Sequence, residues 1–221
     1  MIMSPTTSLA RVSLAVFIAV FAAGTARASL LTIADPSFEG LTLSPGSFTS
    51  GTYAAGSWNS GGNAGIFRPT TASYPGGAPD GSYVGYSSSS TVIDQVLSAT
   101  LTANTTYTLG VAVGSRLDGP HNDGYTIQLL AGGVLLSGTT NFPVPADGSF
   151  VFATDAYTAG ASDPHLGQAL EIRLISAPTG QTSFDNVTLD AVPAVPEPAS
   201  IMMLGITAAG AGLGRWRRKS C

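Results

Sequence analysis

The chain has 221 residues, including 27 glycines and 14 prolines, and only 10% of its residues are charged. This length fits one domain of ordinary size plus processing segments, and a hydrophobic fraction of 44% excludes a chain that is disordered throughout. Residues 29–195 contain three basic residues, no lysine and twelve acidic residues. Such a surface repels polyanions, which argues against nucleic acid as a partner. The only cysteine is Cys221, so no disulfide can form within the chain.

Residues 1–28 have the pattern of a secretory signal peptide. Arg11 precedes the apolar run of residues 12–24, and Ala26 and Ala28 form a cleavage site of two small residues around Arg27. The apolar run is too short to be a comfortable transmembrane helix. We therefore expect a signal helix that is removed on export across the inner membrane, leaving a mature chain that starts at Ser29.

Residues 29–191 show the two-residue hydrophobic alternation of β-strands and no convincing amphipathic helix. The segment 125–138 predicts two strands joined at Gly132-Gly133, because a tight hairpin turn needs positive φ. The other expected strands occupy residues 30–34, 64–68, 83–87, 91–97, 106–113, 149–154, 169–175 and 182–191. Many short strands with turn residues between them predict an all-β fold, an antiparallel β-sandwich of the jelly-roll type.

Asp185 raises a question within the last expected strand. It shares phase with Val187 and Leu189, so simple alternation turns its carboxylate inward. A buried carboxylate is costly unless it is paired or binds a metal. Alternatively, Phe184 marks a bulge that frees Asp185 from this phase.

Five segments of this domain resemble, in their order, the jelly-roll carbohydrate-binding modules and the broader galactose-binding-like domains. They are "DPSFEG" (35–40), "GSWNSGGNAGIF" (56–67), "DGSYVGY" (80–86), "LTANTTYTLGVAVG" (101–114) and "FDNVTL" (184–189). The resemblance implies that Glu39 and Asp185 lie close together and ligate a structural calcium ion (Ca2+), for which oxygen ligands are suited. The alternative is that both carboxylates accept hydrogen bonds from turn N–H groups without a metal.

A sugar site needs aromatic faces and a few polar groups. The candidates are Trp58, Tyr83 and Tyr86, although Trp58 could instead fill the core. No G-x-S-x-G, H-E-x-x-H or P-loop motif occurs, so we predict no catalytic residues and a protein that is not an enzyme. A polysaccharide hydrolase with paired carboxylates is the remote alternative.

The C-terminal part divides into a Pro-rich linker (192–198), a short apolar run (199–214) and a basic tail (215–221). The run is marginal against the ~20 residues that span hydrocarbon. Helix formation is expected to begin after Pro198, because proline cannot continue a helix upstream. Basic residues hold the far end in the cytoplasm; they are Arg215, Arg217, Arg218 and Lys219. We expect a short transmembrane helix that anchors the chain in the inner membrane.

This tail resembles a PEP-CTERM sorting signal, a motif also labelled as the ice-binding-protein C-terminal motif. The motif residues are Val195, Pro196, Glu197, Pro198, Ala199 and Ser200. The resemblance implies recognition by exosortase, a membrane transpeptidase of exopolysaccharide-producing Gram-negative bacteria. Cleavage near Pro196 would make the anchor transient and deliver the domain to the cell surface or outside the cell.

From these observations the sequence predicts an exported, non-catalytic surface or matrix protein linked to exopolysaccharide or biofilm. A carbohydrate-binding module with a Trp/Tyr platform is the alternative, and its partner would be a glycan.

Overall fold

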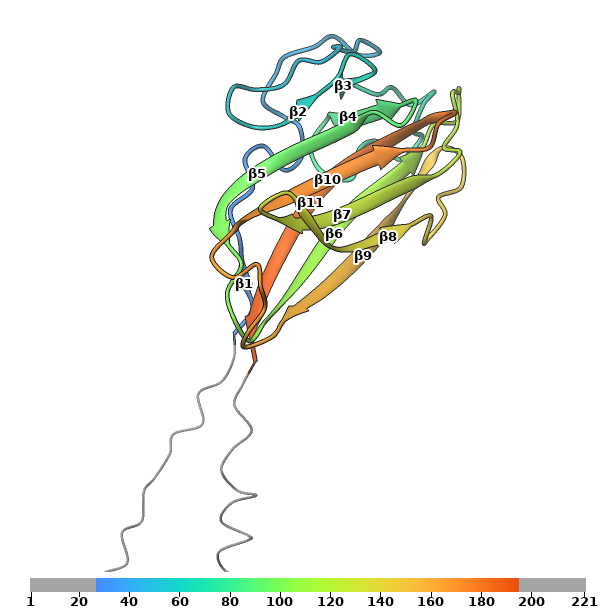
Figure 1. Cartoon of the computed structure of the whole chain (residues 1–221). Coiled ribbons are helices and arrows are strands. Elements are labelled where there is room, and N and C mark those ends of the chain that lie inside the picture. The colour runs from blue at the N-terminus through green and yellow to red at the C-terminus, as the bar shows by residue number, and fades with distance from the viewer. Residues whose placement is uncertain (1–26, 195–221) are drawn as a thin grey trace, which may run out of the picture. The chain divides into compact units, whose positions relative to one another are not determined.

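The computed structural model describes residues 27–194, which form two packed antiparallel β-sheets (Figure 1). The strands are β1 (Ser29–Leu30), β2 (Asn59–Ser60), β3 (Ala64–Phe67), β4 (Val84–Ser88), β5 (Val92–Thr100), β6 (Thr105–Ser115), β7 (Tyr125–Ala131), β8 (Val134–Thr140), β9 (Ser149–Ala159), β10 (Ala169–Ser176) and β11 (Gln181–Pro193). The expected signal helix and C-terminal transmembrane helix lie outside the described residues. Between residues 27 and 194, no helix has the length and apolar character needed to cross a membrane.

The six-stranded sheet has the order β3-β4-β11-β6-β9, with β1 also paired to β11, and the five-stranded sheet has the order β2-β5-β10-β7-β8. Neighbours in each sheet are mostly distant in sequence and pair in antiparallel fashion, as β11 does with both β4 and β6. This arrangement confirms the predicted β-sandwich of jelly-roll type.

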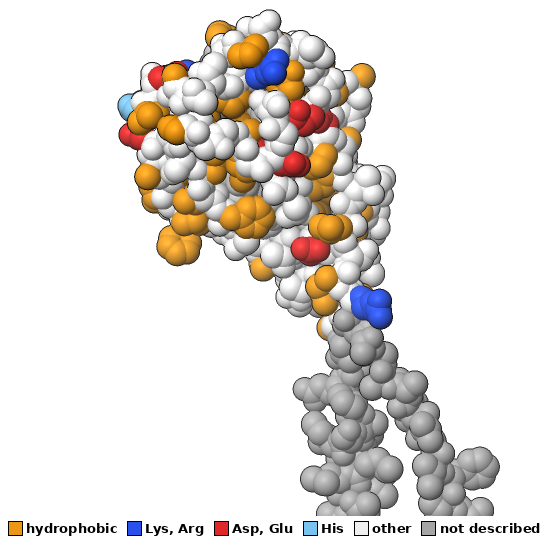
Figure 2. Space-filling model, turned by 180° about the vertical axis from the view of Figure 1, so that it is seen from behind, with side chains coloured by type: hydrophobic (Ala, Val, Ile, Leu, Met, Phe, Trp, Pro, Cys, Tyr) orange, Lys and Arg blue, Asp and Glu red, His pale blue; other side chains and the backbone are white. Residues whose placement is uncertain are grey.

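The core lies between the two sheets and follows the predicted alternation. Leu170, Ile172 and Leu174 of β10 are fully buried, as are Leu109 of β6 and Phe184 of β11. Charged side chains are sparse among hydrophobic and neutral ones on the face shown in Figure 2, as expected from the composition. Burial of apolar surface between the sheets is therefore the main source of stability.

Two local features differ from the expected strands. The first strand ends at Leu30 rather than at residue 34, and Asp35 and Phe38 soon follow with φ of 50° and 60°, so the chain turns there. Strand β2 was not predicted, since a two-residue strand has no readable alternation. The hairpin is confirmed, because Gly132 and Gly133 take φ of 57° and 78° between β7 and β8.

The first and last strands of the domain meet at one end of the sandwich, where Ser29 pairs with Ala191. Strands β6 and β11 run from this end, where Thr105 pairs with Pro193, to the opposite end, where Ser183 pairs with Gly114. A strand rises ~3.3 Å per residue, so Gln181 lies roughly 35–40 Å from Pro193. Loops at the far end are thus well separated from the point at which the chain continues into residues 195–221.

Candidate functional site

The candidate site lies on the outer face of the six-stranded sheet, the face turned away from the five-stranded sheet. Phe184 pairs in register with Val113, and both side chains lie in the core between the sheets. Successive residues of a strand point to opposite faces, so Ser183 and Asp185 lie on the outer face. Tyr86, the partner of Ser183 in register, packs there with Phe67 and Val84 in a second hydrophobic cluster.

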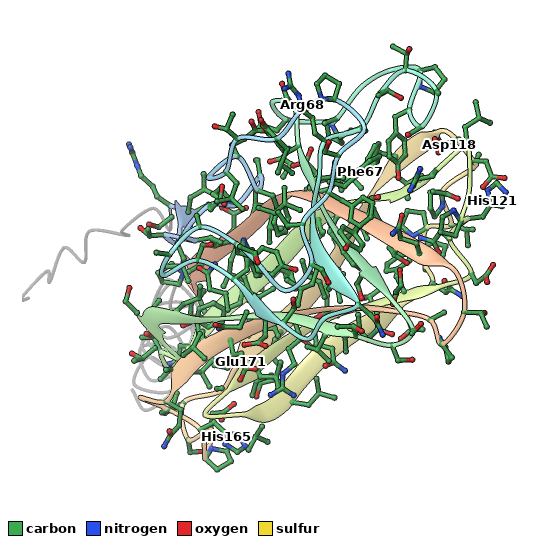
Figure 3. All side chains as sticks on the ribbon, turned by 90° about the horizontal axis from the view of Figure 1, so that it is seen from above. Phe67, Arg68, Asp118, His121, His165 and Glu171 are labelled. Carbon is green, nitrogen blue, oxygen red and sulfur yellow. The ribbon has the colours of Figure 1, made fainter. Side chains whose placement is uncertain are left out.

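A cavity of about 260 Å³ is present beside this cluster. Its lining residues are Phe48, Phe67, Tyr86, Arg116, Pro120 and Gln181. They come from separate parts of the chain: the loop before β2, strands β3 and β4, the loop after β6, and the first residue of β11. Figure 3 labels Phe67 and, nearer the edge of the molecule, Asp118 and His121 of the loop after β6.

The aromatic wall is held together by backbone contacts. Phe48 forms an isolated bridge with Phe67, and its ring meets that of Tyr86 edge-on at a centroid distance of 6.1 Å. The Tyr86 hydroxyl donates a hydrogen bond to the backbone oxygen of Thr49 at 2.6 Å. Phe48 remains 67% exposed although it lines the cavity, so it forms the solvent-facing rim.

Arg116 and Gln181 form the polar side of the cavity. Arg116 Nε donates to Asp118 Oδ1 at 3.0 Å, and Arg116 Nη1 donates to Gln181 Oε1 at 3.3 Å. The Arg116 guanidinium also lies over the Phe67 ring, 4.6 Å from its centroid, in a cation–π contact. The hydrogen bond from Arg116 lowers the pKa of Asp118, which also accepts a bond from Ser73.

Asp185 is fully buried on the same strand face as Gln181. Its carboxylate accepts hydrogen bonds from the backbone N–H of Asp80 at 2.9 Å and of Asn186 at 2.7 Å. Burial raises the pKa of Asp185 to about 7; the two amides oppose this shift, whereas the charges of Asp80 and Glu39 add to it. The register shift that takes Asp185 out of the inward phase of the strand lies after this residue, between Asp185 and Thr188. It does not lie at Phe184.

Glu39 forms hydrogen bonds to the same segment, residues 80–83. Its Oε1 accepts hydrogen bonds from the backbone N–H of Ser82 at 2.6 Å and of Tyr83 at 2.8 Å. Asp80 in turn accepts a bond from the Ser37 hydroxyl at 2.6 Å. Glu39 and Asp185 therefore converge on residues 80–83, as the resemblance to sugar-binding modules implied. Among the residues that the structure describes, no three His, Cys, Asp or Glu side chains are grouped so as to hold a metal ion.

The three expected sugar-site residues do not form one platform. Trp58 is only 4% exposed; it stacks on Phe38 at 5.2 Å and donates its indole N–H to Asp35 O at 2.8 Å. Of the two alternatives stated for Trp58, the core position is the one observed, because the loop folds this ring into the core. Tyr83 is also buried, with its hydroxyl accepting a bond from Leu43 N–H at 3.1 Å. Only Tyr86 reaches the cavity.

Comparison with known proteins decides the family. A family model described as HpiC1 cyclase matches residues 29–190. The chain belongs to the HpiC1-like cyclase family. No curated protein sequence matches the chain.

Solved cyclases share the fold across this domain. The cyclase Fisc from Fischerella sp. TAU, solved with (3Z)-3-(1-methyl-2-pyrrolidinylidene)-3H-indole, is 29% identical with a TM-score of 0.70. The match covers 76% of this chain and 100% of that one. A cyclase from Fischerella sp. TAU solved with 4-(1H-indol-3-yl)butan-2-one is 28% identical over 75% of this chain and 98% of that one, with a TM-score of 0.61.

Membership of a cyclase family corrects the expectation of a non-catalytic protein. That expectation rested on missing motifs for nucleophiles, zinc and phosphate, whose absence does not bear on a cyclase. A sugar-binding module, TmCBM61 solved with β-1,4-galactotriose, is 12% identical over 71% of this chain and 95% of that one. Its TM-score of 0.44 is too low to support an argument about the ligand.

The sorting signal is confirmed, because a PEP-CTERM protein-sorting motif matches residues 194–219. The protein is therefore exported and sorted by this signal. The motif residues 195–200, the basic residues 215–219 and Ala26 lie outside the described residues.

Proposed function

We propose that this member of the HpiC1-like family is an exported cyclase that closes a ring within an apolar, aromatic substrate held in the outer-face cavity. The observation that supports it best is the placement of Asp185, with its pKa raised to about 7, on the strand face that also provides Gln181 to an aromatic cavity. The two relatives described above were solved with indole compounds, which fit a site with aromatic walls.

The cavity contributes binding and conformation. Phe48, Phe67 and Tyr86 offer apolar faces against which a flexible substrate is held in a folded conformer, so its reacting carbons are brought together. The faces of Phe48 and Tyr86 also stabilise positive charge that develops as a ring closes, whereas the Phe67 ring already faces Arg116. Tyr86, which is only 7% exposed, lines the inner side of the cavity, and Phe48 lines its solvent-facing rim.

Asp185 supplies the acid and base. Because burial raises the pKa of Asp185 to about 7, near neutral pH the same residue can donate a proton and then take one back. Protonation of an unsaturated side chain creates a cation, a carbon–carbon bond closes the ring, and loss of a proton restores the carboxylic acid. Substrate and product are isomers, so the reaction needs no co-substrate.

Access to Asp185 requires a local movement. The side chain is fully buried, and along β11 its Cα lies about 13 Å from that of Gln181. The hydrogen bond from Asp80 N–H to Asp185 is the contact that must open when a substrate reaches the carboxyl group. Residues 80–82 are thus the proposed mobile cover of the acid.

The test uses the mature protein recovered from outside the cell and an indole with an alkenyl side chain at C3. Chromatography with mass detection should show an isomer of unchanged mass, and Asp185→Asn should reduce its rate by at least ~100-fold. Asp94→Asn is the matched control, since Asp94 is a partly buried acid with a raised pKa on β5 of the other sheet. An unaltered rate in Asp185→Asn would remove Asp185 from the mechanism.

A structural calcium ion held by Glu39 and Asp185 is the alternative proposal for this pair, in place of the acid role of Asp185. The charges of Asp80 and Glu39 add to the rise in the pKa of Asp185, an effect that a cation would offset. The side chains fit such an ion only in part, because the oxygens of Asp185 and one oxygen of Glu39 already accept backbone amides. Additional backbone oxygens and water would have to complete its ligands. Calcium would keep Asp185 ionised, so the ion and the acid role exclude each other.

Export places the reaction at the cell envelope. We propose that exosortase cuts near Pro196–Pro198 after transient anchoring in the inner membrane, and that the cyclase then works at the surface or within exopolysaccharide. Within the domain, the cavity lies at the end of β11 away from Pro193. Replacing residues 196–198 by alanine should retain the protein in membranes; unchanged release would contradict this route.

A further inference from the structure

The polar side chains that line the cavity offer a ligand mainly hydrogen-bond donors. Arg116 has only donors, and two of them already bind Asp118 and Gln181. Gln181 Oε1 accepts the bond from Arg116, and the Gln181 amide NH2 group forms no hydrogen bond within the described residues. The Tyr86 hydroxyl is bound to Thr49 O on the rim.

The remaining lining residues, Phe48, Phe67 and Pro120, are apolar. A ligand that fills this space must therefore be flat and apolar over most of its surface, and it must bring its own acceptor to the donor edge. A ligand with a cationic group there would meet the Arg116 guanidinium, whose side chain is only 19% exposed.

We propose that the cavity selects a planar aromatic compound whose side chain ends in an acceptor oxygen, a carboxylate or a carbonyl, bound by Arg116 and Gln181. This inference rests on the proposed function, because it names the substrate class of the same cavity. A carboxylate binds better than a ketone, since hydrogen bonds between charged partners are about twice as strong. Arg116 is thus a specificity-determining residue, and the acid catalyst lies elsewhere.

The experiment measures the binding of three matched indoles to the mature protein by calorimetry. The probes are indole-3-butanoate, 4-(1H-indol-3-yl)butan-2-one and the amine of the same chain length. The dissociation constant should rise by about tenfold or more from the acid to the amine, with the ketone between them. An amine that binds as tightly as the acid would overturn the proposal.

Two variants assign the effect to the donor edge. Arg116→Gln should raise the dissociation constant of the acid at least ~tenfold and change that of the ketone little. Gln181→Glu adds a carboxylate beside Arg116, so it should weaken the binding of indole-3-butanoate and strengthen the binding of the amine. Arg68→Gln is the control: Arg68 donates to Leu43 O at 2.7 Å and lies over Tyr83, which does not line the cavity. Equal losses for all three probes in Arg116→Gln would mean that Arg116 only supports the fold.

Failure of this inference differs from failure of the proposed function. Isomerisation of an alkenyl indole without any preference among the three probes would refute the selection by Arg116 and leave the cyclase standing. If the three probes bind in the predicted order but the protein forms no isomer, the selection by Arg116 would stand and the proposed cyclase activity would be refuted.

Discussion

The backbone N–H of Asp80 donates a hydrogen bond of 2.9 Å to the buried carboxylate of Asp185, across 105 positions of sequence. This contact fastens the segment that precedes β4 onto the outer face of β11. Glu39 accepts hydrogen bonds from the backbone of Ser82 and Tyr83 in the same segment. The two acids together therefore fix the position of this segment over the sheet.

The ionisation of Asp185 should make the protein less stable as the pH rises. Its pKa is raised from 3.8 to about 7 by burial, so between these values the folded state binds more protons than the unfolded state. Stability contributed by the neutral acid is present below pH ~4 and is lost as the pH rises through 7, by on the order of 4 kcal/mol in all and about 3 kcal/mol above pH 5. Urea unfolding at pH 5 and pH 8 should show this loss in the native protein and not in Asp185→Asn.

Bound calcium would reverse the sign of that dependence. A cation favours the ionised carboxylate, so the melting temperature at pH 8 should then increase with calcium concentration and fall on chelation. No increase at millimolar calcium would contradict the proposed ion, and the same titration with Glu39→Gln shows whether Glu39 is a ligand.

Gly81→Ala should destabilise the protein by about 2–3 kcal/mol. Gly81 has φ of 69°, where a Cβ is strained, and that Cβ would also collide with the Glu39 carboxylate. Gly77→Ala is the matched control, with φ of 79° and open space around its Cβ position, so it should cost only about 1 kcal/mol. Urea midpoints measure both; equal losses would mean that Glu39 adjusts without cost.

Trp58→Phe tests the core position of Trp58. The change removes the hydrogen bond to Asp35 O and leaves a void beside Phe38, so unfolding should require about 2 kcal/mol less free energy. Ligand affinity in the cavity should be unchanged, because Trp58 does not line it. A loss of binding with unchanged stability would instead restore the surface platform that the sequence suggested.

Phe48→Ala should weaken ligand binding more than it weakens the fold. Phe48 is 67% exposed, so its truncation costs little stability, whereas its ring is part of the cavity wall. Phe142 is 74% exposed and does not line the cavity, so Phe142→Ala should leave affinity unchanged. The dissociation constant of the indole ketone in both variants checks this; similar effects would place the ligand elsewhere.

Local sequence determined most of the secondary structure and the sorting of the protein. Alternation located Leu170, Ile172 and Leu174 in the core, and Gly132-Gly133 located a hairpin, because both signals depend only on neighbouring residues. The resemblance to sugar-binding modules implied that Glu39 lies near Asp185. The C-terminal signal is contiguous and fixed in spacing, so it could be recognised without a fold.

The cavity was decided by tertiary structure alone. Phe48, Arg116 and Gln181 are far apart in the chain, and none lies in a motif; only the antiparallel register of β3, β4 and β11, with the loop after β6, brings them together. The same holds for the burial of Trp58 and for the raised pKa of Asp185. Both depend on which distant segment covers a residue, and desolvation by such a segment leaves no trace in the local pattern of residues.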